Sequence, residues 1–376
     1  MKYSFLSLTI FILILTSCNN KSNISSTTHQ ALSISTDNCI LETEKPALSK
    51  LRYIKLETKE ECLLEDVSKV ICYNNKLYIL STPGNGNVYT FDNNGNYLYK
   101  MNKGEGPEDI MYPTDITINE EKKSLIILDA YRNIKEYNTE NGRFLNKTVI
   151  KEPFFSIETI GNDFLLFDPN SQAKSEFYMR YLQEGGKYNS LFPKITKGSF
   201  FSLPNFFTKI NSEAILVSCI FTDTIYHINN DEKRLTPYLI LNFKGENANA
   251  PQYLDEAQTL GKYLKNARDH KLITGPCDLS YFDENLFFTL KGKDNYFVTY
   301  YKKDNKAFLH KNLFDDLPNI YASTGRTDKE VIFTIDIPWL MEYFKENPQI
   351  ESDIIKQLKK ECNNENDNPV LLFGSF

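Results

Sequence analysis

Short runs in which apolar and polar residues alternate follow one another along most of the chain, a pattern typical of half-buried β-strands. Two stretches, 76–99 and 124–145, align with each other, and each contains three such runs and an Asn-Gly pair. Gly95 and Gly142, the glycines of these pairs, are 47 residues apart. Because Asn-Gly is a strong hairpin signal, each stretch is predicted to be a string of hairpins. A four-stranded repeat of this length is typical of a β-propeller blade.

The rest of the chain repeats the pattern more loosely. Innermost strands are predicted at 67–72 and 115–119, one before each aligned stretch. Further blades are predicted from the paired runs 163–167 with 177–181, 214–219 with 223–226, 286–290 with 296–301, and 330–334 with 369–373.

Two segments depart from this pattern and are predicted to be helical. Residues 252–270 contain few β-branched side chains and read as a helix inserted in a loop, and 338–362 carries apolar residues at helical spacing. Without these segments roughly 286 of the residues in 51–376 remain, close to six repeats of 47. The predicted fold is therefore all-β, a six-bladed β-propeller, with seven blades as the alternative.

The isolated strands at the two ends of this region predict how the ring closes. Residues 53–56 precede the first blade, and 370–373 follow the last. Strands from both ends that share one blade would fasten the ring and leave no long open edge. We therefore expect 53–56 to contact the last blade.

The N-terminus predicts the cellular compartment. Lys2 precedes an apolar run over 5–15, which is too short to span a bilayer and has the length of a signal-peptide core. Leu15-Thr16-Ser17-Cys18 then resembles a bacterial lipobox, so residues 1–17 are predicted to be removed and Cys18 to be lipidated. Residues 18–50, rich in Asn, Ser and Thr, are predicted to be a flexible tether, and 51–376 the propeller domain.

Charge and cysteine content limit the partners and the chemistry. The formal net charge is −6, and −7 once Lys2 is removed, which argues against nucleic acid as a partner. None of the cysteines after Cys18 is spaced C-x-x-C, and at least four are expected to be buried free thiols. These cysteines are Cys39, Cys62, Cys72, Cys219, Cys277 and Cys362.

In the order of these motifs, the chain resembles the six-bladed β-propeller lipoproteins of Bacteroidota, relatives of NHL-repeat propellers. The resemblance rests on the lipobox, the entry strand at 53–57, the blade unit that ends at 91–95, and the segments 223–226 and 368–372. Residues 104–109 (Gly-Glu-Gly-Pro-Glu-Asp) are similar to the family's inter-blade loop, but Glu108 and Asp109 stand where Gly-Glu is usual. The resemblance covers about 50–376. It implies the fold and leaves the activity open, because most members have no assigned function.

Polar loops on one face of such a propeller predict where a ligand would bind. Loops that enter an innermost strand and turns that join second to third strands meet on that face, with 83–87 as the matching turn of the first blade. The alternative is that Asp129 and Arg132 only stabilise their own turn. The ligand-binding candidates are Lys103, Glu105, Glu108, Asp109, Asp129, Tyr131 and Arg132.

No catalytic signature accompanies these candidates. The four histidines are scattered and no G-x-S-x-G motif occurs, so no catalytic residue, metal ligand or cofactor is predicted from a linear motif. A calcium or another divalent ion in the central tunnel needs no such motif and stays open.

The leading hypothesis is a lipid-anchored binding or scaffold protein of the cell envelope, with a protein, small-molecule or glycan ligand. The alternative is a metal-dependent, lactonase-like hydrolase or lyase. Residues 19–22 contain no acidic residue, which favours the periplasmic face of the outer membrane over the cell surface.

Overall fold

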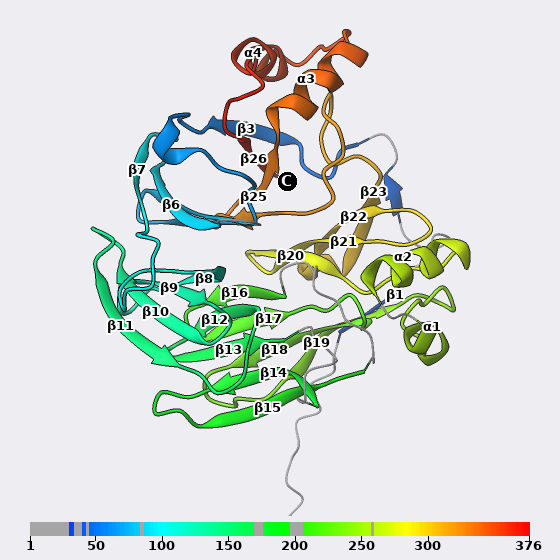
Figure 1. The fold of residues 1–376 in the computed structure, drawn as a ribbon. Coiled ribbons are helices and arrows are strands. Elements are labelled where there is room, and N and C mark those ends of the chain that lie inside the picture. The colour runs from blue at the N-terminus through cyan, green and yellow to red at the C-terminus, as the bar shows by residue number, and fades with distance from the viewer. Residues whose placement is uncertain are drawn as a thin grey trace, which may run out of the picture.

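The computed structural model describes residues 30–33, 40–42, 45–82, 86–168, 176–195, 206–256 and 259–376. The strands of these residues form six antiparallel sets of four, arranged as the blades of a β-propeller (Figure 1). Four sets are separate sheets, and two share an eight-stranded sheet in which β24 pairs with β4. The predicted all-β propeller is confirmed.

Within each blade the strands follow one another from the centre outward. Blade 1 is β4 (Lys69–Tyr73), β5 (Lys76–Ser81), β6 (Asn87–Asp92) and β7 (Tyr97–Lys100). Blade 2 is β8 (Pro113–Asn119), β9 (Ser124–Asp129), β10 (Asn133–Asn138) and β11 (Phe144–Val149). Blade 3 is β12 (Ser156–Ile160), β13 (Asp163–Phe167), β14 (Phe177–Leu182) and β15 (Tyr188–Pro193).

The second half of the ring repeats this order, and its last blade takes one strand from near the start of the chain. Blade 4 is β16 (Phe207–Asn211), β17 (Ala214–Val217), β18 (Thr224–Asn229) and β19 (Thr236–Asn242). Blade 5 is β20 (Cys277–Phe282), β21 (Asn285–Leu290), β22 (Tyr296–Tyr301) and β23 (Lys306–His310). Blade 6 is β24 (Gly325–Arg326), β25 (Val331–Ile335), β26 (Val370–Ser375) and β3 (Lys50–Lys55).

Blade 6 closes the ring as expected. In Figure 1 the blue β3 lies beside the red β26, and Leu371 of β26 pairs with Ile54 of β3. Asn368, just before β26, is 2 % exposed and accepts the amide of Leu64 at 2.9 Å. Its amide nitrogen donates to the carbonyls of Glu57 (2.7 Å) and Cys62 (2.9 Å). The two ends of the propeller are thus joined by backbone pairing and by side-chain contacts, of which those of Asn368 are the most buried.

Turn chemistry and close packing explain the repeat. Gly95 and Gly142 adopt φ values of +85° and +68°, which glycine tolerates best. Between blades the cores are largely aromatic and aliphatic; for example, Phe167 of blade 3 stacks on Phe206, next to blade 4, with ring centroids 3.7 Å apart. Each fully buried side chain of this size contributes roughly 1.5–3 kcal/mol. Six clusters of such residues occur in the described part of the chain, and they hold neighbouring blades together.

Helices lie at the two predicted places, outside the blades (Figure 1). α1 (Pro251–Glu256) and α2 (Leu260–Asp269) occupy the first. The second contains α3 (Ile337–Glu346) and α4 (Asp353–Glu361) rather than one continuous helix. The break follows from Pro348, which disfavours helical backbone at Asn347. Short 3-10 turns lie at Glu60–Cys62 and Lys302–Asp304.

Part of the segment expected to be a tether lies along the propeller. β1 (Gln30–Ser33) pairs in parallel with β19, and β2 (Ile40–Glu42) pairs in parallel with β23. The reason is that the outermost strands of blades 4 and 5 offer unpaired backbone groups to which an extended segment can add. Residues 1–29, and with them the predicted signal peptide and Cys18, lie outside the described residues.

Two further observations concern the compartment. Among the described residues, Cys62, Cys72, Cys219, Cys277 and Cys362 are all free thiols. No helix in the described ranges has the length and apolar character needed to cross a membrane.

Candidate functional site

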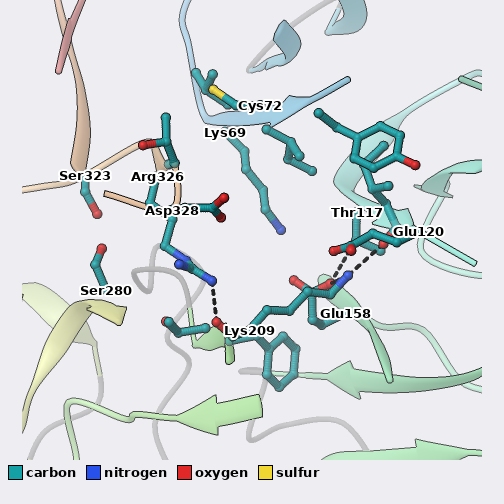
Figure 2. A pocket seen from close by; sticks show the side chains of 18 of the residues that line it. Lys69, Cys72, Thr117, Glu120, Glu158, Lys209, Ser280, Ser323, Arg326 and Asp328 are labelled. Atoms are coloured by element: carbon teal, nitrogen blue, oxygen red, sulfur yellow. Dashed lines mark hydrogen bonds and ion pairs between the residues drawn. The ribbon is translucent and has the colours of Figure 1, made fainter. Parts of the chain in front are cut away.

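A central cavity of about 440 Å³ lies where the innermost strands of all six blades converge. Its wall takes residues from β4, β8, β12, β16, β20 and β24. Figure 2 shows that charged and hydroxyl side chains from these strands extend into the space. The volume of this cavity lies within the range of small-molecule sites, and its wall is more polar than the wall of most such sites.

The first charged pair in the wall joins blades 1, 2 and 3. Lys69 on β4 places Nζ 2.9 Å from Oδ1 of Asp115 on β8, and both side chains are mostly buried. Oδ2 of Asp115 accepts the amide of Ile157, on β12, at 2.8 Å. One carboxylate therefore links three neighbouring strands around the ring.

The second pair joins blades 2, 3 and 4. Nζ of Lys209, on β16, lies 3.3 Å from Oε1 of Glu158 on β12. The same ammonium donates to the carbonyl of Ile118 at 2.6 Å and to Oγ1 of Thr159 at 2.7 Å. Oε1 of Glu158 also accepts the hydroxyl of Thr117 and the amide of Thr159. Each partner of this buried pair is thus satisfied on several sides.

Arg326 on β24 completes the wall from blade 6. Its Nη1 donates to the carbonyl of Tyr281, on β20, at 2.9 Å, and its Nη2 donates to the carbonyl of Lys209. No carboxylate of the described residues lies within ion-pair distance of this guanidinium. Arg326 therefore differs from Lys69 and Lys209, because its hydrogen bonds to the described residues go to neutral carbonyl groups and the acids that act on it lie beyond ion-pair distance.

The shifts in pKa follow from burial and from these pairs. Burial raises the pKa of Asp115 despite the ammonium of Lys69. Burial acts the same way on Glu158, but Lys209 and Lys69 together outweigh it, so its pKa is lowered. For Lys69 the carboxylates of Asp115 and Glu158 outweigh burial and raise the pKa. Burial lowers the pKa of Arg326, with the nearby acids opposing that effect only in part.

One mouth of the cavity is formed by turns that join first to second strands. Asn75, Glu120 and Asp328 line it from three such turns, and Asn211 lines it from the end of β16. Glu120 and Asp328 are exposed there, whereas Asp115 and Glu158 are buried deeper in the wall. The deeper part of the wall thus comprises three half-buried cations and two buried carboxylates, and the further carboxylates of Glu120 and Asp328 lie at the rim.

Comparison with known proteins places this architecture in a family. A family model described as "Domain of unknown function (DUF4934)" matches residues 40–375. The chain belongs to this family. No curated protein matches the chain.

A solved structure shows the same fold. A "putative exported protein" of Bacteroides fragilis NCTC 9343 superposes with a TM-score of 0.75 at 21 % identity, covering 92 % of this chain and 99 % of its own. BamB of Moraxella catarrhalis gives a TM-score of 0.42 at 8 % identity, covering 75 % of this chain and 72 % of its own, too low to support an argument. The B. fragilis structure therefore supports the propeller fold of this DUF4934 chain and nothing finer.

The predicted ligand-binding residues of the DUF4934 chain gather at the other end of the strands. The 103–112 loop leads into the start of β8, whereas Glu120 at the cavity mouth follows its end. The hydroxyl of Tyr137 donates to the carbonyl of Glu108 at 2.8 Å, and the ammonium of Lys135 donates to the carbonyl of Asp109. Of the predicted residues in this loop, Lys103, Glu105 and Glu108 are exposed and Asp109 is half-buried.

The predicted turn at 129–132 packs against this loop. Oδ1 of Asp129 accepts the amides of Met111 (2.9 Å) and Tyr112 (2.6 Å), and its Oδ2 lies 3.0 Å from Nζ of Lys135. Asp129 is 1 % exposed, and its carboxylate joins the 103–112 loop to the turn, whereas Tyr131 and Arg132 are exposed. The loop and the turn do share one face, as expected. As ligand-binding residues, all seven stay predictions, and none of them lines the central cavity.

Sequence reasoning missed the wall of the cavity. Its signal is a charged residue inside an otherwise apolar innermost strand, as in the runs around Lys69, Glu158 and Lys209. Aligning the first strand of every blade would have shown these positions together. The search for ligands in loops overlooked them because each lies within a strand.

The side chains present do not favour a cation in this cavity. Asp115 and Glu158 already face lysine ammonium groups, and Arg326 adds a further positive charge nearby. Among the described residues, no group of three or more His, Cys, Asp or Glu side chains is placed to hold a metal ion. Divalent cations prefer several free oxygen ligands. A calcium or another divalent ion in the central tunnel therefore stays a prediction.

Proposed function

We propose that this protein is a lipid-anchored, six-bladed binding or scaffold propeller of the cell envelope, related to NHL-repeat propellers, whose ligand enters the central cavity. The observation that carries the proposal is the cavity of about 440 Å³ lined from all six innermost strands. Its polar wall is held by contacts between blades, so the site is formed before a ligand arrives. Pre-organisation of this kind favours binding because little ordering accompanies it.

The arrangement supports binding better than catalysis. A general base needs a carboxylate or imidazole free to accept a proton from the substrate. Both buried carboxylates of the wall already accept hydrogen bonds from several neighbours, so neither is available for that role. The hydrolase or lyase alternative is therefore not favoured.

The envelope location rests on the N-terminus and on a relative. Residues 1–17 have the pattern of a signal peptide that ends at Cys18, and the similar B. fragilis protein is described as exported. Two acyl chains on Cys18 would give stable anchoring. The absence of acids at 19–22 favours the periplasmic face of the outer membrane.

Anchoring is tested by expressing the full chain with a clickable fatty acid in a Bacteroidota host. We expect label on the wild-type protein, in the outer-membrane fraction, and loss of both in Cys18→Ser. Cys39→Ser is the matched control and should behave as wild type. Unlabelled wild-type protein in the soluble fraction would contradict the anchor. Protease treatment of intact cells should leave the propeller uncut.

Binding is tested by thermal denaturation of the purified protein against a library of envelope sugars, peptides and small metabolites. We expect at least one compound to raise the Tm in a concentration-dependent way, because a ligand that binds only the folded state stabilises it. No shift with any compound, together with no protein captured on the purified propeller from an envelope extract, would refute the binding role.

A further inference from the structure

We propose that the central cavity binds a small molecule through one anionic group, a carboxylate or a phosphate, which the guanidinium of Arg326 receives. This inference rests on the proposed binding function and adds the chemical class of the ligand. It is carried by the charges of the cavity wall and by the way in which each is satisfied.

Arg326 is the first reason. Its guanidinium lies half-buried in the wall of the cavity and, within the described part of the chain, donates only to the carbonyls of Tyr281 and Lys209. Removing a cation from water is costly where no carboxylate makes an ion pair with it, and an arginine carries five N–H donors in a planar fork. Asp328, Glu158 and Glu120 act on the Arg326 guanidinium from a distance but do not pair with it. Two donations to carbonyls leave donors that an incoming carboxylate or phosphate can use.

The balance of buried charge is the second reason. In the deeper part of the wall, Lys69, Lys209 and Arg326 contribute three positive charges, and Asp115 and Glu158 contribute two negative charges, which leaves one positive charge over. The exposed rim is counted separately, and there Glu120 and Asp328 add two negative charges that face solvent. Figure 2 shows Lys69, Lys209 and Arg326 extending into the same space from three different blades. An anion at Arg326 would restore neutrality in the buried part of the wall.

The rim limits what the rest of the ligand is. Glu120 and Asp328 are exposed at the mouth, so a second anionic group at that end would be repelled. Ser280, Ser323 and Thr327 add hydroxyl groups to the lining. The ligand is therefore a polar molecule that is anionic at its inner end and neutral or cationic at its outer end.

The test is a titration of the full purified chain with inorganic phosphate and, separately, with D-gluconate, followed by NMR line broadening of the ligand. We expect at least one of the two to bind the wild type. Arg326→Lys keeps the charge but loses the fork, so it should weaken binding about tenfold. Asp328→Asn removes a rim carboxylate and should tighten binding about twofold.

The control is Arg234→Gln, which removes an exposed arginine and should bind as the wild type does. Asp328→Asn keeps the test informative even where a change at Arg326 disturbs folding, because the rim position is exposed. Binding of phosphate alone or of gluconate alone supports the inference and identifies the anionic group.

The inference is overturned if neither anion binds, or if Arg326→Lys and Asp328→Asn both bind like the wild type. A neutral library compound that stabilises the wild type and Arg326→Lys equally would leave the binding function standing while refuting the anionic ligand. The two failures are therefore distinguishable.

Discussion

Replacing Asn368 by alanine should loosen the closure of the ring. The side chain makes three hydrogen bonds, to the amide of Leu64 and to the carbonyls of Glu57 and Cys62, at 2.7–2.9 Å. Each such bond contributes about 1 kcal/mol net, and more where a buried partner is left unsatisfied. The free energy of unfolding should therefore fall by about 3 kcal/mol, a large part of the ~5–15 kcal/mol typical of a folded domain.

Urea denaturation followed by far-UV circular dichroism measures this loss. With an m-value of about 3 kcal/mol/M, the midpoint should fall by about 1 M. Asn368→Asp keeps the shape but faces two carbonyl oxygens with a carboxylate, so at neutral pH it should be less stable than Asn368→Ala. Acidification below about pH 4 should restore part of that difference.

The matched control is Asn363→Ala, at an exposed position just after α4. We expect that variant to stay within about 0.5 kcal/mol of the wild type. If Asn368→Ala is no less stable than Asn363→Ala, the side chain does not join the two ends of the propeller, and the reasoning is refuted.

Three further changes test the interior. Lys209→Met leaves Glu158 buried without its ion-pair partner, so the free energy of unfolding in urea should fall by about 3–5 kcal/mol. Adding Glu158→Gln to that variant should recover part of the loss. If the effects of the two substitutions are simply additive, the pairing is contradicted. Burial raises the pKa of Asp278, so the stability it contributes below its unfolded pKa of about 3.9 is lost as pH rises through the folded pKa. Asp278→Asn should therefore match the wild type near pH 4 and be more stable at pH 7, and unfolding curves with the same difference at both pH values would refute this. In Gly325→Ala the new Cβ would lie 2.1 Å from the carbonyl oxygen of Val70, so the free energy of unfolding should fall by about 1–3 kcal/mol. An unchanged Tm would show that β24 and β4 can move apart without cost.

Local patterns were enough to predict the blades and their closure. The Asn-Gly turns, the strand alternation and the isolated terminal strands are all short-range signals, and β3 pairs with β26 as those signals indicated. The division of the C-terminal helical segment was missed because its apolar spacing continues on both sides of Pro348.

The cavity was not predicted because it depends on how six strands meet. Lys69, Glu158 and Arg326 are far apart in sequence, and only closure of the ring brings them to one space. The parallel additions of β1 and β2 were also unforeseen, since they depend on which outer edges remain open once the ring has formed. Local sequence describes neither kind of arrangement.

The parallel pairing of β1 with β19 would limit how far the propeller lies from a bilayer if the chain is lipid-anchored as proposed. If lipid on Cys18 holds the chain, the segment between the lipid and the propeller ends at Gln30, twelve residues after Cys18. It does not extend to the start of β3 at Lys50. A fully extended chain spans about 3.3–3.6 Å per residue, so the segment from Cys18 to Gln30 spans at most about 40 Å. The segment from Cys18 to Lys50 would span about 110 Å. The outer edge of blade 4 would stay close to the membrane. The propeller could rotate about that attachment point, but its distance from the membrane would be limited.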